Sequence, residues 1–211
     1  VRRYSYDRGT ERLSNPIDIL TSLPHGTDHG AGRLLFGPDG KLYLSRGDQG
    51  SNFLANYCNA NHAQDLPTAA DVAAKDWTMY QGKILRINPD GSIPSDNPVI
   101  NGVRSHIFSF GHRNPQGLTF AGNRLFDSEH GESIDDEVNF VLAGRNYGWP
   151  FIAGYQDDQS YVYANWSAAA CHFFSYNNTL PRMALALPWV SRPPSVATGT
   201  VTGKSGMVSV R

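Results

Sequence analysis

The sequence predicts an all-β protein made of short antiparallel strands, and three observations support that fold class. Glycine occurs 21 times and proline 13 times in 211 residues, which favours tight turns and short strands over long helices. Pro-Asp-Gly turns at 38–40 and 89–91 supply the positive φ angles that tight hairpins need. The neighbouring segments 41–44 and 83–87 alternate or run apolar, as strands do.

The sequence contains a weak internal repeat. Residues 3–16 and 85–98 both have the pattern of strand, polar turn and strand. Each is followed by two further strands and a polar or acidic loop, at 34–50 and at 117–131. The repeat is roughly 80 residues long, about twice a bare four-stranded propeller blade. A propeller blade with a long inserted loop, a β-sandwich and a barrel all agree with this pattern.

One short helix is expected inside the inserted segment 51–80. Thr68 and Asp71 have the spacing of a capping box, ahead of a helix-forming run at 72–77. No domain linker is evident before about residue 170. Residues 171–211 lose the strand-and-turn rhythm, so we expect a divergent or disordered tail there, or the end of a shifted reading frame.

The composition excludes several classes of protein. Hydrophobic residues make up 40% of the chain and charged residues 18%, which is enough to bury a core. The formal net charge is −1 and no basic patch is present, so nucleic acid is not an expected partner. No apolar run approaches the roughly 20 residues of a transmembrane helix. Cys58 and Cys171 match no metal spacing, which leaves one disulfide or two reduced thiols as alternatives.

One histidine and two aspartates are candidates for a proton-transfer site. His29 follows Asp28 in a glycine-flanked loop, and an imidazole can act as a general base near neutral pH. Asp48 follows the strand at 42–45 and can orient a histidine by accepting its second N–H group. A surface histidine and a turn aspartate are the alternative interpretations.

The segment 111–117 carries a candidate clamp for an anion or a quinone oxygen. Arg113 offers a planar bidentate donor, and Asn114 is held extended because a proline follows it. An ordinary polar loop between strands is the alternative interpretation.

Acidic residues at 128–137 form a candidate calcium site, since Ca²⁺ prefers closely spaced oxygen ligands. A solvated acidic loop is the alternative. The turn at 146–150 contains Tyr147 and Trp149, for which packing in the core is the expected role.

The order of these motifs resembles the soluble glucose dehydrogenase family, which depends on pyrroloquinoline quinone (PQQ), within the wider glucose/sorbosone dehydrogenase group. The resemblance runs from about residue 1 to residue 170, through the segments DHGAGRLLFGPDGKLYLSRGDQG, SHIFSFGHRNPQGL, SEHGESIDDEVN and AGRNYGWPFIAGYQDD. It implies a six-bladed β-propeller of four-stranded antiparallel blades with long inserted loops. Residues 1–170 would form a central part of that propeller.

The same resemblance implies an oxidoreductase that oxidises the C1 hydroxyl of aldoses such as glucose to the lactone. His29 would take the hydroxyl proton as hydride passes to PQQ, and Asp48 would pair with His29. Asp28 would lie at the cofactor and sugar site, and Arg113 and Asn114 would bind the quinone. An external electron acceptor, a possible homodimer, and a periplasmic or secreted location are further implications.

Three calcium sites are also implied. The catalytic ion would be held by the backbone carbonyls of Gly131 and Glu132. The two structural ions would be held by Glu137 with Tyr147, and by Ala153 with Tyr155 and Asp157.

The chain departs from the family pattern at several positions. Phe53 stands where glucose-specific members have a glutamine, His130 also replaces a glutamine, and Glu132 replaces a proline. Cofactor-binding residues that come later in the family have no counterpart here. A non-catalytic calcium-binding propeller module is therefore a second hypothesis, and a calcium-dependent lactone hydrolase is a third.

Overall fold

The computed structural model describes residues 1–51, 56, 59–131, 136–150 and 207–210, and these residues are mostly strand. The strands are β1 (Arg2–Asp7), β2 (Arg12–Asp18), β3 (Leu34–Phe36), β4 (Leu42–Arg46), β5 (Lys83–Ile87), β6 (Val99–Ile100), β7 (Val103–Arg104), β8 (Ile107–Phe110), β9 (Pro115–Ala121), β10 (Arg124–Glu129), β11 (Asp136–Val141) and β12 (Met207–Val210). The helices are α1 (Ala69–Ala74) and a 3-10 turn (Thr78–Tyr80). None of the described helices is long and apolar enough to cross a membrane.

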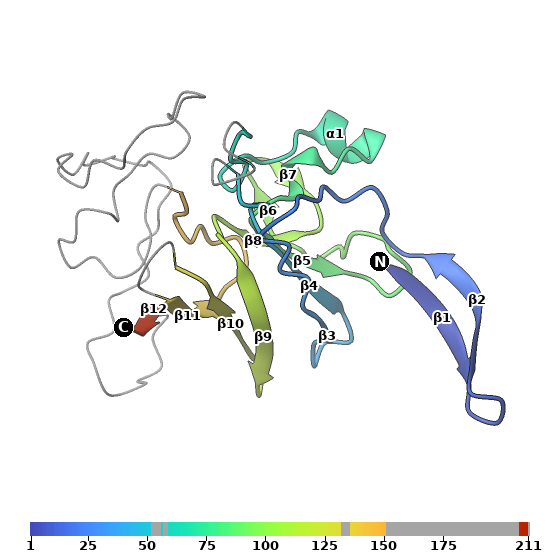
Figure 1. Cartoon of the computed structure of the whole chain (residues 1–211). Coiled ribbons are helices and arrows are strands. Elements are labelled where there is room, and N and C mark those ends of the chain that lie inside the picture. The colour runs from blue at the N-terminus through green and yellow to red at the C-terminus, as the bar shows by residue number, and fades with distance from the viewer. Residues whose placement is uncertain (52–55, 57–58, 132–135, 151–206, 211) are drawn as a thin grey trace, which may run out of the picture.

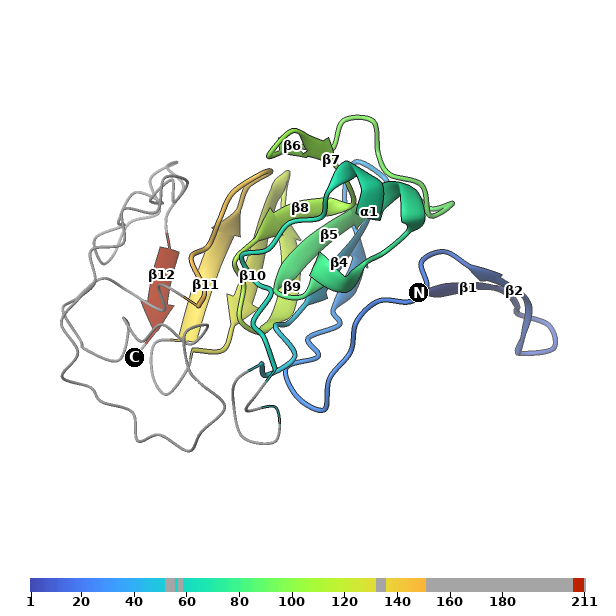
Figure 2. The ribbon, with the colours of Figure 1, turned by 90° about the horizontal axis from the view of Figure 1, so that it is seen from above.

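The first four-stranded sheet has the antiparallel order β3-β4-β5-β8 (Figures 1 and 2). Two long insertions interrupt it, at 47–82 between β4 and β5 and at 88–106 between β5 and β8. The first insertion carries α1, where Thr68 and Asp71 form the predicted capping box. The sheet therefore has the expected form of four sequential strands with long inserted loops.

The second four-stranded sheet has the order β12-β11-β10-β9. Its outer strand β12 comes from the segment 171–211, for which we expected a divergent tail. Only residues 207–210 of that segment are among those that the structure describes.

The two sheets pack against each other through aromatic side chains. Tyr43 on β4 makes an edge-to-face contact with Phe120 on β9 of the other sheet, at a ring-centroid distance of 5.1 Å, and a second one with Phe108 on β8 of its own sheet, at 5.3 Å. Leu42 and Leu44, which alternate with Tyr43, point into a separate cluster around Trp77 and Tyr80. Both faces of the first sheet are thus buried, and burial of this apolar area is the main driving force for the fold.

One expected strand is absent. We predicted a second strand within 85–98, but residues 88–98 form turns after β5 ends at Ile87. Asn97 is buried there and donates from Nδ2 to the carbonyls of Arg86 and Ser105. Because this side chain takes over acceptors that a neighbouring strand would use, the segment stays irregular.

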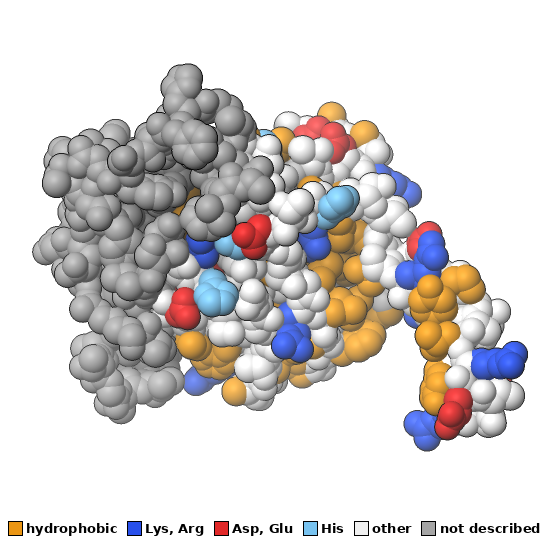
Figure 3. Space-filling view, viewed as in Figure 1, with side chains coloured by type: hydrophobic (Ala, Val, Ile, Leu, Met, Phe, Trp, Pro, Cys, Tyr) orange, Lys and Arg blue, Asp and Glu red, His pale blue; other side chains and the backbone are white. Residues whose placement is uncertain are grey.

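The hairpin of β1 and β2 projects from the two sheets (Figures 1 and 2). Its strands are exposed along their whole length, and large apolar side chains lie open on them at Tyr4, Tyr6, Leu13 and Ile17. Figure 3 shows apolar side chains gathered along this hairpin. An exposed apolar surface of this kind is typical of an interface.

Candidate functional site

The strand registers bring the candidate residues to the same side of both sheets, where strands begin and end. This side is called the edge below. The end of β4 pairs with the start of β5, and the start of β5 pairs with the end of β8. In the second sheet the start of β9, the end of β10 and the start of β11 are likewise neighbours. The loops that contain Asp48, Arg113 and Gly131 leave the sheets at these ends, and residues 111–114 connect the two groups.

His29 and Asp48 meet at this edge. Nδ1 of His29 lies 2.7 Å from Oδ1 of Asp48, and both side chains are buried. A carboxylate can only accept, so Nδ1 of His29 carries the hydrogen in this contact. The backbone N–H of His29 donates to Oδ1 of Asp28 at 2.7 Å. His29 also has a left-handed backbone, with φ of 43°, which is uncommon outside glycine and is frequent at functional sites.

Gly47 allows the His29 loop and the Arg113 loop to come close together. A Cβ atom at Gly47 would lie 1.9 Å from the carbonyl oxygen of His29 and 3.2 Å from that of Arg113. The backbone N–H of Asp48 donates to the carbonyl of Arg113 at 2.8 Å. Only a residue without a side chain fits between these backbones, so the site depends on a glycine at this position.

The guanidinium of Arg113 lies across the same edge. Its Nη1 donates to the carbonyl of Gly131 at 2.7 Å and approaches that of His130 at 3.3 Å. Its central carbon lies 5.3 Å from the centroid of the Trp149 ring, within the range of a cation–π contact. Arg113 therefore connects Asp48, the partner of the expected base, with the loop of the expected calcium carbonyl.

Two buried polar atoms at this edge lack hydrogen-bond partners among the described residues. They are Nε of Arg113 and Oδ1 of Asn114. Buried polar atoms are nearly always paired, so a donor and an acceptor left open on adjacent residues indicate a polar ligand. A quinone that carries carboxylates and ring nitrogens offers partners for both atoms, so these residues fit PQQ.

A buried ionisable cluster lies behind Arg113, and the sequence reasoning missed it. Nδ1 of His112 lies 2.9 Å from Oε2 of Glu129 and 3.3 Å from Oδ2 of Asp127. The backbone N–H of Arg113 donates to the other oxygen of Glu129. Burial lowers the pKa of His112 to about 4 and raises the pKa of Asp127 to about 8, and it also raises the pKa of Glu129. Glu129, which belongs to the acidic segment 128–137, is therefore buried, and the alternative interpretation of a solvated loop does not hold for this residue.

The predicted calcium residues are only partly described. Glu132, Ala153, Tyr155 and Asp157 lie outside the described residues, as does Phe53. Glu137 is buried and accepts from Nδ2 of Asn139 at 3.1 Å. The hydroxyl of Tyr147 donates to the carbonyl of Phe140 and accepts from the N–H of Leu142.

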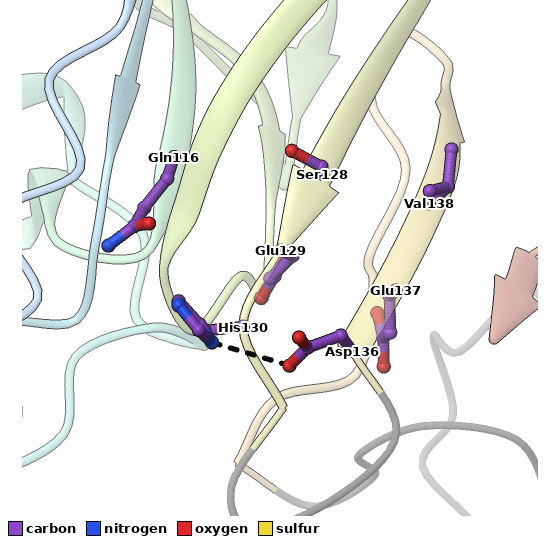
Figure 4. A pocket seen from close by; sticks show the side chains of 7 residues that line it. All are labelled: Gln116, Ser128, Glu129, His130, Asp136, Glu137 and Val138. Atoms are coloured by element: carbon purple, nitrogen blue, oxygen red, sulfur yellow. Dashed lines mark ion pairs between the residues drawn. The ribbon is translucent and has the colours of Figure 1, made fainter. Parts of the chain in front are cut away.

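A pocket of about 170 Å³ opens beside these residues (Figure 4). His130 and Asp136 face each other at 3.3 Å in this pocket, and Glu137 lies next to Asp136. The remaining lining residues are Gln116, Ser128, Glu129 and Val138. Carboxylates from β10 and β11 therefore line this pocket, a donor set that suits a hard cation such as Ca²⁺.

Two further residues reach the site without having been predicted there. Nε1 of Trp149 donates to Oδ2 of Asp48 at 2.7 Å, so Trp149 is not simply a core residue. Nδ2 of Asn61 donates to the same oxygen at 3.2 Å. Trp149 belongs to the aromatic turn singled out in the sequence, whereas nothing in the sequence around Asn61 marks it.

Comparison with known proteins places these motifs in a family context. Residues 1–172 match the family model for glucose/sorbosone dehydrogenase. The chain is 54% identical over 171 residues to quinoprotein glucose dehydrogenase B from Acinetobacter calcoaceticus, covering 81% of this chain and 36% of that protein. It is 37% identical over 155 residues to the aldose sugar dehydrogenase YliI of Escherichia coli, covering 69% and 36%.

Solved structures agree with these matches. The PQQ-bound aldose sugar dehydrogenase from Streptomyces coelicolor superposes with a TM-score of 0.57 at 36% identity, over 71% of this chain and 40% of that one. The chain thus spans less than half the length of the relatives it matches.

Proposed function

The chain belongs to the glucose/sorbosone dehydrogenase family, and we propose that it carries the proton-abstracting and quinone-binding part of a PQQ-dependent aldose dehydrogenase. The relatives named above are sugar dehydrogenases, which supports an oxidoreductase. The observation that carries the proposal is the convergence of His29, Asp48 and Arg113 at one edge of the two sheets.

In this proposal His29 is the general base for the C1 hydroxyl of the sugar. Its Nδ1–H is held by Asp48, so Nε2 is the ring nitrogen that would take the proton. Asp48 then stabilises the imidazolium that forms and keeps the ring in one orientation. Asp28 fixes the backbone of the base through its bond to the N–H of His29.

Arg113 and Asn114 would hold the cofactor, through the buried atoms that are open in the described structure. The carbonyls of Gly131 and Glu132 would hold the catalytic Ca²⁺, and Glu137 with Tyr147 a structural one. Ala153, Tyr155 and Asp157 would hold a third ion. When bound, PQQ would supply the two-electron acceptor and Ca²⁺ a Lewis acid.

The proposal extends to the whole protein. Residues 1–170 would form part of a six-bladed propeller, and another blade would cover the exposed apolar side chains of the β1–β2 hairpin. The sugar is an aldose that becomes a lactone, electrons leave to an external acceptor, and the protein is periplasmic or secreted. A homodimer is part of the same proposal, as is a divergent segment at 171–211.

A dye-reduction assay tests the function. The full chain is reconstituted with PQQ and Ca²⁺ and offered a panel of aldoses, and His29→Ala is compared with His25→Ala. His25 lies in the same loop region and is exposed. We expect His29→Ala to lower kcat by about 100-fold or more, since removal of a general base costs that much. Activity that survives His29→Ala would exclude this assignment of the base.

A calcium-binding module without turnover is the second candidate, because the carboxylates of Glu129, Asp136 and Glu137 line one pocket. It predicts thermal stabilisation by Ca²⁺ in the absence of any dye reduction. Glu137→Gln should abolish that stabilisation, whereas Glu11→Gln, in the exposed hairpin turn, should not.

A further inference from the structure

Asp48 is held through both of its oxygens. Oδ1 lies 2.7 Å from Nδ1 of His29 and accepts from the N–H of Gly50 at 2.8 Å. Oδ2 accepts from Nε1 of Trp149 at 2.7 Å and from Nδ2 of Asn61 at 3.2 Å. Asp48 is 1% exposed, so these groups replace water around a buried carboxylate. A carboxylate offers about four acceptor positions, and donors on both oxygens fix its rotation.

Trp149 makes the stronger of the two hydrogen bonds to Oδ2 of Asp48. Its N–H bond is shorter than that of Asn61, and the whole residue is 5% exposed. Its ring also lies under the guanidinium of Arg113, at 5.3 Å. One side chain therefore contacts both the partner of the expected base and the residue expected to bind the quinone.

The backbone around Trp149 is fastened independently of Asp48. The N–H of Trp149 donates to the carbonyl of Gly111 at 2.9 Å, and its own carbonyl accepts from Nε2 of Gln64 at 2.6 Å. Gln64 also pairs with Asn146 through its amide, at 2.7 and 3.0 Å. Because these bonds fix the indole in place, its N–H is a preset donor rather than one that adapts to Asp48.

The loop that carries Asn61 is fastened from the other side. Lys83 at the start of β5 is wholly buried and donates from Nζ to the carbonyls of His62, Ala63 and Gln81, at 2.7 to 2.9 Å. The carbonyl of Ala63 also accepts from the N–H of Gly111. The two donors on Oδ2 thus come from rigid loops that meet near Gly111.

We propose that Trp149 is a positioning residue for the His29–Asp48 pair, with Asn61 in a supporting role. It acts through Asp48: by anchoring Oδ2 it keeps Oδ1 on Nδ1 of His29 and so holds the imidazole ring in one orientation. This inference rests on the proposed function of His29 as the base. It assigns to Trp149 no contact with the reacting atoms.

The test compares Trp149→Phe with Trp77→Phe in the full chain. Both changes remove an indole N–H and leave an aromatic ring, and Trp77 is equally buried but packs against Tyr80 and His106. The first readout needs neither cofactor nor turnover. It is the rate at which diethyl pyrocarbonate acylates His29, followed by peptide mass spectrometry. We expect Trp149→Phe to slow this acylation at least threefold and Trp77→Phe to leave it unchanged.

The second readout is turnover with PQQ, Ca²⁺ and an aldose. We expect Trp149→Phe to lower kcat about tenfold with little change in KM, since a hydrogen bond to a charged group is lost. In an Asp48→Ala background the same change should have no further effect, because Trp149 then has nothing to position.

The outcomes separate the two proposals. A wild-type chain that reduces no dye counts against the proposed function, and the acylation rates then decide the role of Trp149 alone. Equal acylation of His29 in the Trp149→Phe and Trp77→Phe proteins overturns the positioning role. So does a loss of rate on Trp149→Phe that is just as large in the Asp48→Ala background.

Discussion

Nδ1 of His29 and Oδ1 of Asp48 lie 2.7 Å apart, although the two residues are separated by 19 positions and by a strand hairpin. This contact makes a specific prediction for Asp48→Asn. The amide cannot stabilise an imidazolium as a carboxylate does, and it can present an N–H to the ring, which favours the wrong tautomer. We expect kcat for aldose oxidation to fall by roughly 100-fold or more, with a smaller change in sugar KM. Steady-state dye reduction measures both constants.

Gly47→Ala should damage the same site through the backbone. The added Cβ would meet the carbonyl oxygen of His29 at 1.9 Å, and a backbone atom cannot move aside as a side chain can. We expect a loss of activity together with a loss of stability of several kcal/mol, as for other overpacked positions. Gly30→Ala is the matched control, since it adjoins His29 and an added Cβ there meets nothing within 4 Å. Equal effects of the two changes would contradict the close-approach argument.

Asp127→Asn should remove a pH dependence of stability. Burial raises the pKa of Asp127 from 3.8 to about 8 in the folded chain. The contribution of this group to stability is therefore complete below pH 3.8 and is lost as the pH rises through 8. Ionisation of Asp127 should cost the wild type up to about 1.4 kcal/mol per pH unit in this window, and Asp127→Asn should remove this part of the loss while the part due to Glu129 stays.

Urea unfolding at several pH values measures this effect. The Asp127→Asn protein should gain stability over the wild type as the pH is raised from 4 to 8. Glu11→Gln, which changes an exposed carboxylate in the hairpin turn, is the control and should follow the wild type.

Lys83→Met should lower the free energy of unfolding more at high pH than at low pH. Burial lowers the pKa of Lys83 from 10.5 to about 7, so the unfolded chain binds a proton that the folded chain lacks between these values. The wild type therefore gains stability as the pH rises from 7 towards 10.5, and the methionine variant has no such gain.

The same substitution also removes the donors to three backbone carbonyls. Each lost bond should cost about 1 kcal/mol, so the variant is expected to be less stable than the wild type at high pH. The difference between the two proteins should widen by a few kcal/mol between pH 6 and pH 9. A constant difference over that range would exclude the lowered pKa.

Local sequence patterns determined most of the strands and the one capped helix. The Asp-Gly turn at 38–40 and the alternation around Tyr43 act within a few residues, so β3, β4 and the helix at Thr68 were predictable. The pattern failed at 88–98, where Asn97 takes up backbone acceptors from elsewhere in the sheet. That competition depends on residues that only the fold brings together.

The motifs themselves identified the family and named His29, Asp48, Arg113 and Asn114. Only the tertiary structure decided how these residues meet, and it added Trp149, Asn61 and the buried cluster behind Arg113. The reason is physical. A turn or a cap is set by neighbours in the chain, whereas Trp149 reaches Asp48 across 101 residues, by strand registers and glycine contacts that no local pattern encodes.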